Sequence, residues 1–427
     1  MLGVRVRLMR VARSVGVVVS WCALVLGAAG CVGGEDGPDV DRYEASGDVP
    51  GLGTIRSSDV GLVGLTDFDN RRRDAVVVSH DGGRTWRTAD LPDQPPELTL
   101  MRSPHGLLTD GDLMAVVGRD PTSASPHLPV AKSQFFVWTT SDGERWEAHV
   151  FDTSGGLVGE PTLLAVGPVL VASTSTSAGF DVFTSGDRAA SWQRAEVTGL
   201  DQAPFEGLTA VDASAAGDRL RLEVGPITGP DDRRQVLTSD DGGGTWVAAP
   251  CERDCLPSAR PGVPVVQHRE VSMDGGATWH EVAVDPPPRG DDGPYLSAPV
   301  EVPGGWLASA SSYDAGDVSY GMLLRSSHGR SWRQVLPDPC TVGRPNSSVS
   351  DPFRVDGRWY VTYVCVDLMI PVSAVLYDGG ADARSFEPVE GTERDGLSFG
   401  EPIRDGDRVL LPEFNDDDEL DGVTAIG

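Results

Sequence analysis

The chain has 427 residues, of which 64 are acidic and 35 are lysine or arginine, so its formal net charge is −29. A chain this acidic repels a phosphate backbone, which excludes nucleic acid as an expected partner.

The first 30 residues have the features of an export signal. Four arginines precede an apolar run from Val15 to Leu26, which at 12 residues is too short to span a bilayer and is typical of a signal-peptide core. The run ends in 28-AAGC-31, which resembles the lipobox of bacterial lipoproteins, although alanine stands where leucine is more common. The resemblance implies removal of residues 1–30 and a lipid on Cys31 that anchors the protein to the cell membrane, facing outside the cytoplasm. The alternative is an ordinary secretory signal with an incidental cysteine.

Residues 31–41, CVGGEDGPDVD, contain glycine, proline and acids with almost nothing to bury. This composition predicts a flexible tether ahead of a folded body that spans residues 42–427. Removing the four arginines of the signal would leave a mature charge of −33, since residues 1–30 contain no acid.

An octapeptide recurs along the body. Full copies are 79-SHDGGRTW-86, 239-SDDGGGTW-246 and 272-SMDGGATW-279, and 185-SGDRAASW-192 is a near match with alanine for glycine. Degenerate copies are 139-TTSDGERW-146 and 325-RSSHGRSW-332, with serine at the aspartate position, and a seventh is 377-YDGGADARSF-386. The spacing of about 50 residues is typical of propeller blades. The fixed positions are Ser79, Asp81, Gly83, Thr85, Trp86, Asp187, Trp192, Ser239, Asp241, Gly243, Trp246, Ser272, Asp274, Gly276 and Trp279.

This octapeptide resembles the Asp-box, or BNR repeat, of sialidases, other glycoside hydrolases, sortilin-type receptors and a photosystem assembly factor. The resemblance implies a β-propeller over most of residues 42–427, with the boxes at the blade periphery opposite the ligand face. Enzymes and non-enzymes share this architecture, so it does not identify an activity.

The residues between the boxes support the same fold. A second turn, such as 109-TDGD-112 or 355-VDGR-358, precedes a short apolar strand in each unit, and Arg219–Val224 alternates strictly. We therefore expect an all-β protein of seven or eight four-stranded blades, in which 41-DRYEA-45 completes the last blade.

The box residues have a structural interpretation. The aspartate can accept hydrogen bonds from nearby backbone N–H groups, and the glycines permit positive φ. Because a repeat fold needs its turn chemistry repeated, we expect the boxes to hold turns rather than ligands.

Four cysteines remain in the exported body, an even number that predicts two disulfides. Cys340 enters a unit and Cys365 closes the second strand of that unit, so both reach the same face and are expected to pair. Cys251 and Cys255 are then left to pair locally. We expect neither a metal nor a cofactor, because no histidine or cysteine cluster has a metal-binding spacing.

The face opposite the boxes is the expected place for a ligand. Its candidate residues are Asp67, Arg72, Tyr295, Tyr313, Asp314, Tyr320, Arg344 and Glu401.

Two functions fit this sequence. The favoured one is a non-catalytic, membrane-tethered propeller that binds a glycan, peptide or protein; the alternative is an exo-sialidase-like glycoside hydrolase. A sialidase needs three arginines around the substrate carboxylate and a tyrosine–glutamate pair, and its Arg-Ile-Pro motif is missing here. Four arginines occupy comparable points beside the inner turns and are interpreted as solvated turn residues, namely Arg56, Arg102, Arg354 and Arg404.

Overall fold

The computed structural model divides into two units, Met1–Pro38 and Asp39–Gly427. It describes residues 40–46, 52–66, 75–93, 99–100, 106–119, 133–200, 208–216, 219–226, 234–250, 262–267, 269–274, 278–290, 292–314, 318–336, 339–340, 346–367, 370–415 and 420–427. The predicted signal segment and Cys31 lie outside the described residues. The described residues contain no apolar helix of membrane-spanning length.

The second unit is all-β, and its described strands form eight sheets, which we number in chain order. The first sheet contains β2 (Leu52–Ser58), β3 (Gly61–Thr66), β4 (Val76–Ser79) and β5 (Arg87–Thr88). The second contains β6 (Thr99–Leu100), β7 (Leu107–Asp110), β8 (Leu113–Arg119), β9 (Gln134–Thr140) and β10 (Glu147–Asp152). The third contains β11 (Thr162–Val166), β12 (Val169–Thr176), β13 (Gly179–Ser185) and β14 (Gln193–Arg194). The fourth contains β15 (Glu196–Thr198), β16 (Leu208–Ala216), β17 (Arg219–Pro226), β18 (Gln235–Ser239) and β19 (Thr245–Pro250).

The remaining sheets repeat this plan. The fifth contains β20 (Val265–Gln267), β21 (Glu270–Ser272) and β22 (His280–Glu281). The sixth contains β23 (Ala283–Asp285), β24 (Asp292–Leu296), β25 (Val300–Val302), β26 (Gly305–Tyr313), β27 (Ser319–Ser326) and β28 (Ser331–Leu336). The seventh contains β29 (Asn346–Val349), β30 (Phe353–Val355), β31 (Arg358–Asp367), β32 (Ile370–Asp378), β33 (Glu387–Pro388) and β34 (Arg394–Asp395). The eighth contains β35 (Ser398–Phe399), β36 (Ile403–Asp405), β37 (Arg408–Phe414), β38 (Leu420–Ile426) and β1 (Val40–Glu44).

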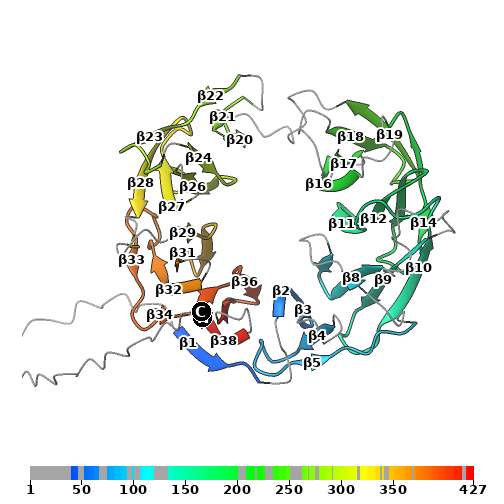
Figure 1. The fold of residues 1–427 in the computed structure, drawn as a ribbon, viewed down its shortest axis with the longest axis horizontal. Coiled ribbons are helices and arrows are strands. Elements are labelled where there is room, and N and C mark those ends of the chain that lie inside the picture. The colour runs from blue at the N-terminus through cyan, green and yellow to red at the C-terminus, as the bar shows by residue number, and fades with distance from the viewer. Residues whose placement is uncertain are drawn as a thin grey trace, which may run out of the picture. The chain divides into compact units, whose positions relative to one another are not determined.

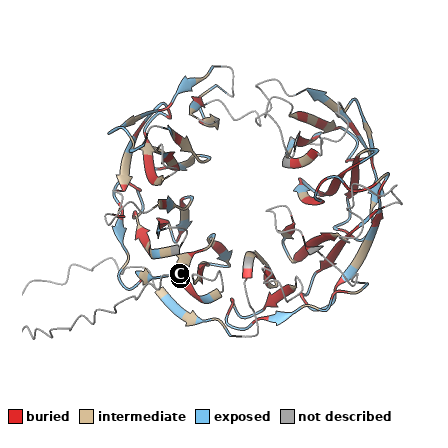
Figure 2. Cartoon of the chain, viewed as in Figure 1, coloured by how far each residue is buried: buried red, intermediate tan, exposed pale blue. Residues whose placement is uncertain are grey.

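Apolar side chains pack between successive sheets of this unit. One buried cluster joins the first and second sheets, others join the second to the third and the third to the fourth, and the series continues from the fifth sheet to the eighth. A further cluster joins the eighth sheet back to the first. Figure 1 shows the sheets following one another around a central opening, an arrangement consistent with a β-propeller. Buried residues lie on the sheet faces that meet, while short outer strands such as β5 and β14 are exposed (Figure 2).

The N-terminal strand completes the last sheet, as the sequence predicts. β1 pairs antiparallel with β38, with Val40 opposite Ile426 and Glu44 opposite Gly422. The strand begins at Val40, inside the segment expected to be a tether. Because β1 and β38 come from opposite ends of the body, their pairing ties these two ends together.

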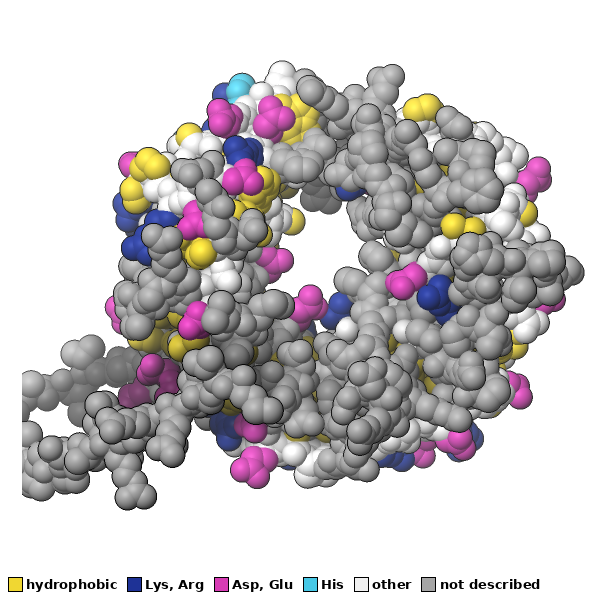
Figure 3. Space-filling view, in the orientation of Figure 1, with side chains coloured by type: hydrophobic (Ala, Val, Ile, Leu, Met, Phe, Trp, Pro, Cys, Tyr) yellow, Lys and Arg dark blue, Asp and Glu magenta, His cyan; other side chains and the backbone are white. Residues whose placement is uncertain are grey.

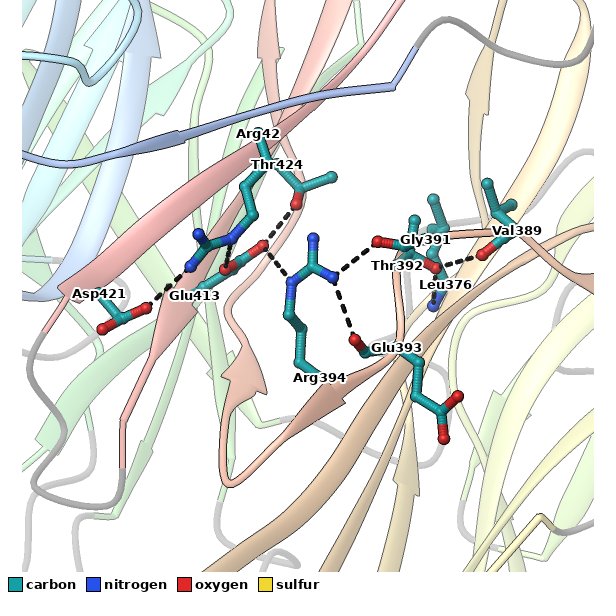
Figure 4. A network of polar contacts seen from close by, with 10 residues as sticks. All are labelled: Arg42, Leu376, Val389, Gly391, Thr392, Glu393, Arg394, Glu413, Asp421 and Thr424. Carbon is teal, nitrogen blue, oxygen red and sulfur yellow. Dashed lines mark hydrogen bonds and ion pairs between the residues drawn. The ribbon is translucent and has the colours of Figure 1, made fainter. Parts of the chain in front are cut away.

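A buried carboxylate reinforces this junction (Figure 4). Glu413 in β37 has a side chain that is 0% exposed, and it accepts hydrogen bonds from Arg42 Nε in β1 at 2.8 Å and from Arg394 Nε in β34 at 3.1 Å. The Thr424 hydroxyl donates to the same carboxylate at 2.5 Å. Glu413 therefore connects the first strand, the last sheet and the neighbouring seventh sheet. The hydrogen bond between Arg42 and Glu413 is the main cause that raises the pKa of Arg42.

The full octapeptides form one hydrogen-bonded turn. In the second full copy the Ser239 hydroxyl donates to Asp241 Oδ1 at 2.8 Å, and the Thr245 N–H and hydroxyl donate to the two carboxylate oxygens at 3.0 and 2.6 Å. Trp246 Nε1 donates to the Gly243 carbonyl at 3.0 Å. The copies that begin at Ser79 and Ser272 show the same serine and threonine bonds to their aspartates. Gly276 lies outside the described residues.

The degenerate copies differ from the expected alignment, in which both have lost the aspartate. In the copy at 139–146 the chain makes a shorter turn, and Asp142 Oδ1 accepts from the Thr140 hydroxyl and from the Arg145 N–H at 3.0 and 2.8 Å. Backbone bonds from Arg145 and Glu144 lower the pKa of Asp142 to about 2. In the copy at 325–332 the imidazole of His328 takes this place, with Ser331 Oγ 3.1 Å from its Nε2.

The predicted Cys340–Cys365 disulfide is confirmed, with a Cα–Cα distance of 5.7 Å. It joins the segment that enters the seventh sheet to β31, where Cys365 lies opposite Ser347 of β29. Cys251 and Cys255 lie outside the described residues, so their pairing stays a prediction.

Candidate functional site

The structure brings together four of the eight predicted ligand-face residues. Tyr295, Tyr313, Asp314 and Tyr320 lie at one end of the sixth sheet, where Tyr313 pairs with Ser319 at the β26–β27 hairpin. The octapeptide turn at residues 325–332 follows the other end of β27. Asp67, Arg72 and Arg344 lie outside the described residues.

An aromatic pair with a charged rim forms the centre of this group, which we call the tyrosine cluster: Arg269, Asp292, Tyr295 and Tyr313. The rings of Tyr295 and Tyr313 are 5.9 Å apart and tilted by 60°, and Tyr313 is 38% exposed. The Tyr295 hydroxyl donates to Asp292 Oδ1 at 2.9 Å, and Arg269 lies over the Tyr295 ring and forms an ion pair with Asp292. The cluster offers aromatic faces and fixed polar groups to solvent, which suits the binding of sugars and peptides.

Tyr320 and Asp314 are tied to each other beside this cluster. The Tyr320 hydroxyl donates to Asp314 Oδ2 at 3.2 Å, while Asp314 Oδ1 accepts from the Val318 N–H at 3.1 Å. Asp314 therefore accepts hydrogen bonds from both the Tyr320 side chain and the Val318 backbone.

A β-bulge, which the sequence patterns did not predict, interrupts the inner strand of several sheets. In the seventh sheet the Ser350 N–H donates to the Thr362 carbonyl, and Phe353 pairs with Tyr360. Asp351 and Pro352 therefore stand opposite one residue of β31, and the inner strand splits into β29 and β30 because proline has no N–H to donate. The registers give the same bulge at Glu160-Pro161, Ala298-Pro299 and Glu401-Pro402.

The bulges present exposed side chains along strands that border the central opening in Figure 1. Glu160, Ala298, Asp351 and Glu401 are exposed, and each precedes the proline of its bulge. In the space-filling view acidic side chains border the hollow at the middle of the unit (Figure 3). In the sequence, each of these bulges is marked by a glutamate, aspartate or alanine followed by proline, just before the second half of the inner strand.

A cavity of about 610 Å³ lies between the bulges of the seventh and eighth sheets. Its polar lining includes Asp351, Glu401 and Thr362, and its apolar lining includes Phe353 and Phe399. Asp351 Oδ1 accepts from the Ser309 hydroxyl at 2.5 Å, so the sixth sheet also holds this wall in place.

Glu401 and Arg56 form an ion pair between two sheets. Glu401 lies in the bulge between β35 and β36, and its Oε2 accepts from Arg56 Nη1 of β2 at 2.8 Å. Arg56 is therefore an ion-pair partner between the eighth and first sheets rather than a solvated turn residue. The two residues are 345 positions apart, so no local pattern could have paired them.

Within the described ranges, no three His, Cys, Asp or Glu side chains come together in a way that could hold a metal ion.

No family model matches the chain, and no curated protein is similar to it in sequence. Among solved structures it is similar to a Trypanosoma rangeli sialidase in complex with the inhibitor DANA, with 15% identity, a TM-score of 0.35, and 83% of this chain covered. The same sialidase in complex with 2,3-difluorosialic acid, a covalent intermediate, gives 14% identity, a TM-score of 0.35 and 79% coverage. The chain spans only 60% and 58% of those two chains. A TM-score this low establishes neither the fold nor an activity for this chain.

Proposed function

We propose that this protein is a lipid-anchored, extracytoplasmic β-propeller of eight Asp-box blades that binds a glycan, peptide or protein at the cell surface. The described strands form eight sheets, which supports the blade number. The pairing of β1 with β38 places the first described strand in the last of these sheets. The export signal and the cysteine at its end support the anchor, with Cys31 as the lipidated residue.

The tyrosine cluster carries the binding function. Tyr313 of its aromatic pair is exposed and Tyr295 is half-buried, its polar groups are fixed by Asp292 and Arg269, and it lies at the end of the sixth sheet away from an octapeptide turn. Aromatic side chains lose little conformational entropy on binding, so a fixed pair with one exposed ring is a favourable contact surface.

The alternative is an exo-sialidase-like glycoside hydrolase, for which Tyr320 is the candidate nucleophile. Its hydroxyl donates to the carboxylate of Asp314, whereas the sialidase resemblance implies a tyrosine–glutamate pair, and this difference favours binding over hydrolysis.

One experiment separates the two functions. The purified full chain is screened against glycan and peptide arrays and is incubated with a fluorogenic sialoside. We expect array binding that Tyr313→Ala weakens and that Val150→Ala, an exposed control on β10, leaves unchanged, with no sialoside turnover. Turnover that Tyr320→Phe abolishes would contradict a binding-only protein.

A further inference from the structure

We propose that the cavity between the seventh and eighth sheets binds a lysine side chain of a peptide segment that enters the central opening. This inference deepens the proposed binding function and rests on it, but it concerns a separate site from the tyrosine cluster.

The first observation is an uncompensated negative charge. Asp351 accepts a hydrogen bond from the neutral Ser309 hydroxyl, and no cation among the described residues pairs with it. Glu401, by contrast, is already paired with Arg56. The cavity therefore has room for one positive charge from a ligand, because a carboxylate beside an apolar wall is stabilised by an opposite charge.

The second observation is a hydroxyl that lines the cavity without a protein partner among the described residues. Thr362 is 2% exposed and lines the cavity. Its backbone N–H donates to Ser350 Oγ at 2.9 Å, but within the described part of the chain its hydroxyl has no hydrogen-bond partner. A hydroxyl that lines a cavity without a protein partner bonds to water or to a ligand, so a ligand donor can take the place of that water.

The third observation is the composition of the walls. Phe353, Phe399 and Pro352 offer an apolar surface, while Asp351, Glu401 and Thr362 offer oxygen atoms in the same cavity. A lysine matches this combination, since its four-carbon stem can pack on the rings and its ammonium group has three N–H donors for three oxygens. A volume of about 610 Å³ also leaves space for the flanking peptide, because it lies within the usual range of ligand pockets.

The bulges explain how this site is built. Two residues face one at each bulge, which turns Asp351 and Glu401 away from the ladder, and proline at the next position fixes the backbone. Both carboxylates are exposed, so an extended segment can reach them without opening the fold.

The test measures, by titration calorimetry, the affinity of the purified full chain for a five-residue peptide that has lysine at its centre and alanine at the other positions. The matched peptides carry Nε-acetyllysine or norleucine at the centre. We expect the lysine peptide to bind at least about tenfold more tightly than either, because a charge-assisted hydrogen bond is lost in both. Equal affinity for the three peptides would overturn the proposal.

The variants locate the site. Asp351→Asn keeps the shape of the side chain and removes its charge, and Thr362→Val removes the hydroxyl at similar volume. We expect each to weaken the lysine peptide, Asp351→Asn by at least about tenfold. Asp356→Asn makes the same charge change on an exposed turn of the same sheet and is expected to leave affinity unchanged. An equal effect of Asp351→Asn and Asp356→Asn would mean that only overall charge matters and would overturn the site.

A glucosamine oligomer is the third arm, because it also carries primary ammonium groups. If this oligomer binds in an Asp351-dependent way and the lysine peptide does not, the proposed peptide ligand is wrong. If the lysine peptide fails while Tyr313-dependent array binding persists, only this inference fails. Loss of both would remove the binding function itself.

Discussion

Replacing Glu413 by alanine tests whether the buried carboxylate holds the two ends of the body together. The substitution leaves Arg42, Arg394 and the Thr424 hydroxyl without their shared acceptor (Figure 4). Removing one partner of a buried ion pair costs about 3–5 kcal/mol, which is a large part of the 5–15 kcal/mol that stabilises a typical domain. We expect the loss in the free energy of unfolding to lie near the lower end, about 3 kcal/mol. Arg42 is 34% exposed and can turn to water, so most of the loss comes from Arg394, which is only 14% exposed.

The measurement is urea unfolding of the purified full chain, followed by tryptophan fluorescence. Glu393→Ala is the matched control, since only the backbone carbonyl of Glu393 contacts Arg394 and its side chain is exposed. Arg42→Ala is expected to lower the free energy of unfolding by less than Glu413→Ala does, because the Glu413 carboxylate still forms its ion pair with Arg394. If Glu413→Ala unfolds at the same urea concentration as Glu393→Ala, the carboxylate does not contribute to closure and the reasoning is refuted.

Three further predictions concern the disulfide, the octapeptide turns and the anchor. Replacing Cys340 and Cys365 together by serine is expected to lower the free energy of unfolding by about 3 kcal/mol, since the bond closes a loop of 25 residues; unchanged urea unfolding would contradict this. Asp241→Ala is expected to lower the melting temperature and leave array binding intact, and a loss of affinity at constant melting temperature would show that the turn binds a ligand. Hydrogen bonds from the Thr245 hydroxyl and N–H lower the pKa of Asp241 to about 2, below its unfolded value of about 3.9. Its stabilising effect should therefore be complete above about pH 4 and disappear as the pH falls through 2, a loss that hydrogen exchange at the Thr245 amide can follow. Cys31→Ala is expected to release the protein from membranes or leave it unprocessed, and normal membrane retention in cell fractionation would remove the lipoprotein proposal.

The sequence determined those features whose chemistry is local. The hydrogen bonds of an octapeptide turn lie within eight residues, as those of Ser239, Asp241 and Thr245 show. The same residue types at the same spacing therefore predict the same turn elsewhere in the chain. Hairpin turns and strand alternation are equally local, and they also fix the direction of each strand. That direction was enough to pair Cys340 with Cys365 across the seventh sheet.

In the degenerate octapeptides, a change of one residue in the spacing made the predicted alignment wrong. The copy at 139–146 retains its aspartate at Asp142, one position later than the alignment expects, because a turn shortened by one residue still brings the carboxylate to the Arg145 N–H. His328 shows that a ring nitrogen can take the same place in another copy. Only the backbone path of each turn decides which atom lies within hydrogen-bonding distance.

The tertiary structure alone decided the contacts between sheets. Arg42 and Glu413 are 371 positions apart, and Arg56 and Glu401 are 345 apart, so these pairs exist only because the last sheet packs against the first. The cavity between the seventh and eighth sheets likewise needs two bulges from different sheets to face each other. The acid–proline pairs at 351–352 and 401–402 are visible in the sequence, but their meaning depends on a register that only the folded ladder fixes.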